Sequence, residues 1–171
     1  MWTWLPYFLT ASFKASLKGT TLQETSTLFA FLTIGISGAI GSIIGGLCAD
    51  KIGKSRLSMI AMIVSAVSSL CIGLTFGLSI WITVIVAIIW GISVVADSAQ
   101  FSAMVADFAK SECAGTALTF QMAIGFLITV FSIYLIPVFE DIVGWKWAFS
   151  ILAIGPVIGV WAMISLIRYK H

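Results

Sequence analysis

The residues that could do chemistry in this chain are few and widely spaced. The single histidine, His171, is the last residue, and the acidic residues are isolated from one another and from any nucleophile. Enzyme active sites need such groups gathered with suitable geometry. The three cysteines (Cys48, Cys71 and Cys113) have neither metal-ligand spacing nor a disulfide framework. The sequence therefore predicts no enzyme, no cofactor and no metal site.

Asp97 is the one carboxylate expected inside an apolar segment. An acid in the hydrocarbon of a membrane is costly and is by default a functional candidate, so Asp97 could carry a coupling proton. The alternative is structural, because Ser98 or water could satisfy it near a helix end. The other candidates for a solute or proton pathway could instead anchor or bridge helices. They are Trp4, Tyr7, Gln100 and Gln121.

A dense group of charges occupies the stretch from Gly46 to Arg56, between two long apolar runs. Asp50 is followed by Lys51, Lys54 and Arg56, and Gly53 permits a tight turn that side chains would obstruct. Cations in such a turn remain in water beside anionic headgroups. We interpret this stretch as a hinge at a membrane surface.

Composition places these residues in a membrane protein. The chain is 60% hydrophobic and 9% charged, against roughly 45–50% and about 25% in soluble domains. A net charge of +2 gives no argument for nucleic acid. We expect an all-α integral membrane protein in contact with the lipid bilayer.

Six spans are predicted along a single domain, residues 1–171. The first apolar run is shorter than the about 20 residues that a spanning helix needs, so we expect a truncated first helix. The fourth helix should continue past its span through Asp107, Ser111 should cap the fifth helix, Pro137 should close it, and Gly155-Pro156 should bend the sixth. The spans are expected at about 2–16, 25–49, 57–78, 80–103, 114–136 and 147–167.

Glycines recur at helical spacing within these spans and predict close helix packing. The second span holds four of them at intervals of three and four, which would expose bare backbone for either a sliding contact or a static one. The packing candidates are Gly35, Gly38, Gly41, Gly45, Gly125, Gly155 and Gly159.

The cations predict the orientation. Six of the nine Lys and Arg residues fall on the side of the 46–56 stretch, and Lys14, Lys18 and Lys146 fall on the other. The positive-inside rule puts the richer side, with both termini, in the cytoplasm. We therefore expect a multi-pass protein of the cytoplasmic (inner) membrane.

The 46–56 stretch resembles the signature loop of the major facilitator superfamily, roughly G-x-L-A-D-R-x-G-R-K. Gly46, Ala49, Asp50 and Gly53 match it, and Lys51 and Lys54 are conservative replacements, whereas Cys48 and Ser55 depart from it. The runs 96–103 and 144–149 look like the C-terminal half of bacterial members grouped with nitrate/nitrite porters. The glycine-rich nitrate signature is missing from the fifth span, so nitrate is not named as the substrate.

The resemblance implies half of a secondary transporter that moves a small solute by alternating access, built as a 3+3 inverted repeat. A C-terminal fragment is the first interpretation, and a natural half that pairs with a second six-helix chain is the other. By resemblance, Gly46, Asp50, Lys51, Gly53, Lys54 and Arg56 would form a conformational latch in which Asp50 faces the start of a helix of the opposite half. The alternative function is a six-helix scaffold or channel, which would need a pore-lining segment or a ring of charges that the sequence does not display.

Overall fold

The computed structural model describes the backbone of residues 1–16 and 22–169, and these residues form helices and turns without any strand. The expected connection at Lys18 and the terminal Lys170 and His171 lie outside the described residues. The elements in chain order are α1 (Leu5–Ser16), α2 (Leu22–Ile52), α3 (Lys54–Leu74), α4 (Ile80–Phe108), α5 (Ala114–Val143), α6 (Trp145–Ala148), the 3-10 turn η1 (Phe149–Ala153) and α7 (Ile154–Tyr169).

Five helical segments of the described chain are long and apolar enough to cross a membrane: Thr27–Ile52, Lys54–Leu74, Ile80–Phe108, Ala114–Val143 and Trp145–Arg168. The last joins α6, η1 and α7 into one span. With 12 residues, α1 is shorter than the about 20 residues that a spanning helix needs. The protein is therefore a multi-pass helical membrane protein with five segments of spanning length.

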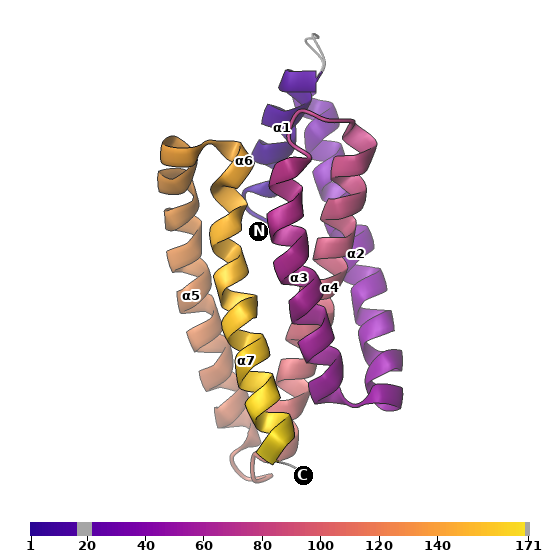
Figure 1. Cartoon of the computed structure of the whole chain (residues 1–171). Helices are drawn as coiled ribbons and strands as arrows, with labels where there is room; N and C mark the ends of the chain where they lie inside the picture. Colours follow the sequence, from indigo (N-terminus) through magenta and orange to yellow (C-terminus); the bar gives the residue numbers. More distant parts are fainter. Residues whose placement is uncertain (17–21, 170–171) are drawn as a thin grey trace.

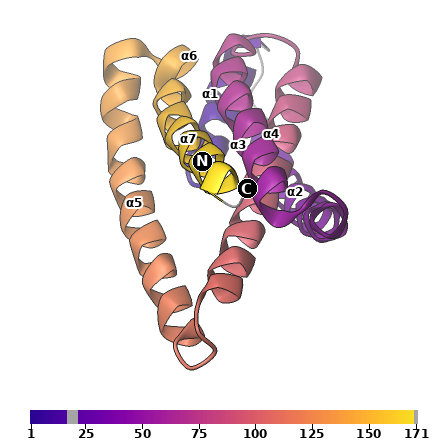
Figure 2. The same cartoon turned by 60° about the horizontal axis from the view of Figure 1, so that its bottom comes forward.

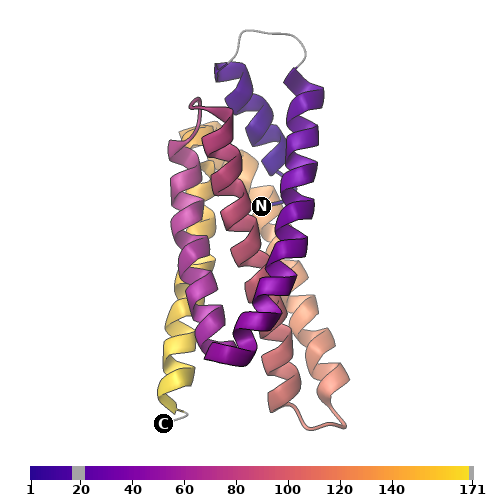
Figure 3. The same cartoon turned by 90° about the vertical axis from the view of Figure 1, so that its right-hand side faces the viewer.

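The long helices stand side by side as one bundle (Figure 1). The α2–α3 turn, the α4–α5 connection and the end of α7 lie together at the lower end of that view, and the α3–α4 and α5–α6 connections lie at the upper end. Figure 3 shows α1 beside only the upper part of α2.

Burial is very uneven among the helices. In α3, 56% of the spanning window is buried inside the bundle, whereas in α5 the share is 6%. Figure 2 shows why, because α3 and α4 lie at the centre while α5 and α2 lie at opposite sides. A helix that is apolar all round and covered by little protein presents its side chains to lipid or to a further protein.

Two apolar clusters hold the bundle together. The larger lies around α1, with Phe8 and Trp90 in edge contact with Phe149 at ring-centroid distances of 5.2 and 5.4 Å. The smaller consists of Met62, Met104 and Met163, which come from α3, α4 and α7. Methionine fills irregular gaps between helices, so this second cluster joins the three helices at a level below the first.

Close backbone contacts pack α2 on α4. A Cβ added at Gly41 would lie 2.9 Å from the carbonyl oxygen of Ile92, and one at Gly45 would lie 3.3 Å from the Cα of Ala96. Two glycines that were not predicted are tighter still: Gly91 lies against Ser37, and Gly73 lies against the backbone of Lys146. Gly159 lies against the side chain of Met62.

The remaining predicted packing glycines have open surroundings. A Cβ at Gly35, Gly38, Gly125 or Gly155 would meet nothing within 4 Å. Of the four regularly spaced glycines of α2, two thus contact α4 and two lie free, so the four do not act as one packing face within this bundle.

Two expectations about helix ends were wrong. Pro137 does not close the fifth helix but lies inside α5, which ends at Gly144 with φ 73°. The residue that caps α5 is Cys113 rather than Ser111, and it makes no side-chain capping bond. The last span is irregular at the 3-10 turn η1, which lies directly before Gly155-Pro156. A proline cannot donate a hydrogen bond to the preceding turn.

Candidate functional site: the charged hinge

The chain reverses direction between α2 and α3 at a single residue, Gly53. Gly53 has φ 88° and ψ 143°, and its N–H donates to the carbonyl of Ala49 at 3.0 Å. Only glycine adopts this region of backbone space without strain. Because α2 runs to Ile52 and α3 begins at Lys54, the charged side chains around Gly53 are projected from two helix ends.

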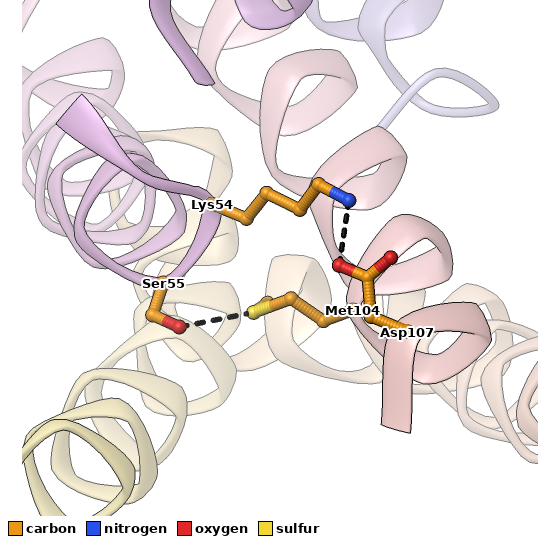
Figure 4. Close-up of polar contacts among 4 residues, drawn as sticks. All are labelled: Lys54, Ser55, Met104 and Asp107. Atoms are coloured by element: carbon orange, nitrogen blue, oxygen red, sulfur yellow. Dashed lines mark hydrogen bonds and ion pairs between the residues drawn. The ribbon is translucent and has the colours of Figure 1, made fainter. Parts of the chain in front are cut away.

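The first residues of α3 are tied to the last turns of α4 (Figure 4). The Lys54 ammonium lies 2.6 Å from Oδ2 of Asp107, and the Ser55 hydroxyl donates to the sulfur of Met104 at 3.3 Å. The Lys54 and Asp107 side chains are 37% and 56% exposed. An ion pair so open to water contributes about 0.2–1 kcal/mol to stability. The pair therefore orients the start of α3 toward α4 but stabilises the hinge only weakly.

Asp50 has no ion-pair partner within the described chain, and its side chain is exposed. It lies at the rim of a groove of about 520 Å³ between α2 and α4, whose lining includes Ser42, Gly46 and Ala103 with Gln100. A Cβ at Gly46 would meet nothing within 4 Å. Ile43, Leu47 and Lys54 complete the lining. The groove is therefore open, with small residues on both helices and a carboxylate at its edge. Lys51 and Arg56 are exposed nearby.

Gln100 provides the polar part of this groove. Its Nε2 donates to the carbonyl of Gly45 at 3.0 Å, while its buried Oε1 has no protein partner in the described chain. An unpaired buried acceptor costs about 1–3 kcal/mol. The groove therefore offers one accessible hydrogen-bond acceptor, the Asp50 carboxylate, while the Gln100 oxygen is unpaired but buried.

A polar stripe along α4 contacts mostly the neighbouring helices; it consists of Ser93, Asp97, Gln100, Met104 and Asp107. Asp97 accepts a hydrogen bond from Ser58 of α3, Met104 contacts Ser55, and Asp107 pairs with Lys54. Ser93 returns its hydroxyl to the carbonyl of Trp90 at 2.7 Å. The stripe thus fastens α4 to α2 and α3.

The five predicted pathway residues are not gathered into one site. Trp4 and Tyr7 lie at the start of α1 with tilted rings whose centroids are 5.4 Å apart, and Tyr7 borders a cavity of about 600 Å³ with Thr10, Lys14 and Trp145. Asp97 and Gln100 belong to the α2–α3–α4 packing described above. Gln121 lies on α5, half-buried, with its Oε1 unpartnered in the described chain.

Two contributors to the hinge were missed from the sequence. From the sequence, Asp107 is expected in the fourth helix but not as the partner of Lys54, and Ser58 is not singled out. The spacing of Asp97, Met104 and Asp107 on one helix face was a signal that these side chains face a neighbouring helix. No signal in the sequence identifies which residues of that neighbour they meet.

The fold and the hinge together define a class: a helical multi-pass membrane protein whose second and third helices are joined by a compact acid-and-base turn. The whole chain, residues 1–171, matches the sequence model of the Major Facilitator Superfamily, and the protein belongs to that family, whose members are membrane transporters. No curated protein and no solved structure matches it significantly. No group of three His, Cys, Asp or Glu side chains in the described residues could hold a metal ion.

Proposed function

We propose that the chain is one half of a secondary transporter, which moves a small solute across the cytoplasmic membrane by alternating access. The likeness of runs 96–103 and 144–149 to bacterial nitrate/nitrite-porter-like members supports a place near that group. The complementary half is a segment that precedes this one in a longer polypeptide, or a second six-helix chain. The hinge with its cations is assigned to the cytoplasmic face.

The observation that carries the proposal is the unpaired Asp50 at the rim of the α2–α4 groove. Small side chains along the groove let a helix backbone approach closely. The first four N–H groups of a helix lack intrahelical partners and carry the positive end of the helix dipole. The beginning of a helix from the opposite half would supply the donors that the Asp50 carboxylate lacks.

This contact would act as a latch. With the groove occupied, the two halves are held together at the cytoplasmic end. Separation of the halves on that side leaves the Asp50 carboxylate exposed to water, as it is here. The energy at stake is modest, because a carboxylate at a helix N-terminus contributes about 0.3–2 kcal/mol depending on burial. A latch of this strength can open and close within a transport cycle.

The test is uptake of labelled small solutes into proteoliposomes that contain this chain with its complementary half. We expect saturable uptake of at least one solute, and we expect Asp50→Asn to change the initial rate by about two- to thirty-fold, the factor that corresponds to the latch energy. Asp141→Asn is the matched control, because Asp141 is also an exposed acid but lies at the far end of α5.

Saturable uptake that Asp50→Asn leaves unchanged would reject the latch while retaining the transporter. A complete absence of uptake for the paired halves, with correct folding, would instead favour a membrane scaffold.

A further inference from the structure

Pro137 lies inside α5 and should disrupt it locally. Proline has no N–H, so it cannot donate to the carbonyl four residues earlier, and its ring crowds that carbonyl. In α5 that carbonyl belongs to Ile133. The helix nevertheless continues through Pro137 to Val143, so another donor should satisfy the oxygen that the proline leaves without its helical bond.

The donor comes from the other end of the chain. Nε1 of Trp4 donates to the carbonyl oxygen of Ile133 at 3.0 Å, across a separation of 129 residues. Trp4 lies directly before α1, and its carbonyl accepts the N–H of Phe8 at 3.0 Å. Its ring also contacts the tilted ring of Tyr7 at a centroid distance of 5.4 Å. The indole is thus held at the start of α1 with its single donor aimed at the carbonyl that Pro137 frees.

This bond lies in the part of α5 that is packed most deeply into the bundle. Ile136 is the one buried residue of α5 and belongs to the large apolar cluster, whereas residues earlier in the helix such as Phe120 and Leu127 are about 70% exposed. Between the α4–α5 connection and Ile133, α5 therefore has little protein to fix its direction. A small change of angle near Pro137 would move the long lower part of the helix through a large arc.

We propose that Trp4 and Pro137 form a clasp that sets the angle of α5 relative to α1. With the indole bonded to the Ile133 carbonyl, α5 is held against the bundle. When the bond breaks, the proline leaves α5 free to pivot, and water or a local change of helical pitch satisfies the carbonyl. Trp4 is thus a positioning residue for α5, a role distinct from lining a solute pathway. This inference does not depend on transport.

Spin labels can test the clasp in the full chain reconstituted in lipid nanodiscs. In a background with Cys48, Cys71 and Cys113 replaced by Ser, labels at Ile60→Cys on α3 and Phe120→Cys on α5 report the angle, since both positions are exposed. Trp4→Phe keeps an aromatic ring and removes the donor. We expect a second, displaced population of the distance between the labels, with the ratio of docked to displaced α5 changed by about two- to twelve-fold.

Pro137→Ala provides the decisive comparison. It restores an N–H that can donate to the Ile133 carbonyl within the helix, so Trp4→Phe should have no effect in a Pro137→Ala chain. Trp161→Phe is the matched control, since Trp161 is 73% exposed on α7, and it should leave the distances unchanged.

The clasp is rejected if Trp4→Phe leaves the distances unchanged, if it broadens them equally with and without Pro137, or if Trp161→Phe has the same effect. Should Trp4→Phe alone fail to fold, recovery of folding by Pro137→Ala would support the clasp. Failure of both the single and the double variant would reject it, because Trp4 would then act through packing alone.

Discussion

At the scale of single residues, the hinge depends on the backbone of Gly53 and much less on its charges. The Lys54–Asp107 pair is exposed on both sides and is therefore weak. The positive φ of Gly53, by contrast, is a conformation that other residues adopt only under strain. The helix reversal that presents Asp50 and Lys54 follows from this one position.

We therefore predict that Gly53→Ala destabilises the folded chain by about 1–3 kcal/mol, the usual cost of a strained backbone position. The measurement is the free energy of unfolding in mixed micelles under a denaturing detergent. Gly46→Ala is the matched control, because Gly46 lies inside α2 with open space around it. Alanine there should be neutral or stabilise the helix by up to about 1 kcal/mol. Equal effects of the two substitutions would contradict a special role for Gly53.

At the scale of elements, the sequence predicts those features that depend on neighbouring residues in the chain, namely helices and the turns between them. The hydropathy runs locate the long helices, and the cluster from Gly46 to Arg56 marks the turn between α2 and α3. The partner of Lys54 is 53 residues away, and no local pattern identifies it. Pro137 also shows that local rules miss distant contacts. A local rule ends the helix at this proline, but the helix continues, and Trp4 satisfies the carbonyl that the proline frees.

The glycines of α2 give a prediction at this scale, because the structure separates positions that the sequence treats alike. A methyl group at Gly41 would meet the backbone of α4, which cannot yield as a flexible side chain can. Gly41→Ala should therefore force α2 away from α4 and cost about 1–3 kcal/mol, as overpacking does. Gly38→Ala, with nothing within 4 Å, should not destabilise. The same unfolding assay checks both, and a harmless Gly41→Ala would mean that α2 and α4 pack less closely than described.

At the scale of the whole molecule, the hinge, the α4–α5 connection and the end of α7 share one end of the bundle. This arrangement places the cations of the hinge at the same end as Lys110 and Arg168. The positive-inside rule therefore predicts one and the same membrane side for all of them. It also means that the proposed latch and the lower part of α5 lie at the same membrane face. The clasp at Trp4 lies away from the hinge, because Trp4 packs against the larger apolar cluster around α1.

Orientation can be measured with a native residue. Cys113 is exposed in the α4–α5 connection, so in a chain with Cys48 and Cys71 replaced by Ser it is the single reactive thiol. If the hinge side is cytoplasmic, a membrane-impermeant maleimide should label Cys113 in inverted vesicles and leave it unlabelled in intact cells. A chain with Cys113→Ser and Ser79→Cys, at the exposed start of α4 on the opposite end, should show the reverse pattern. Labelling of Cys113 from outside intact cells would put the hinge on the external face, where Asp50 could not latch the cytoplasmic side.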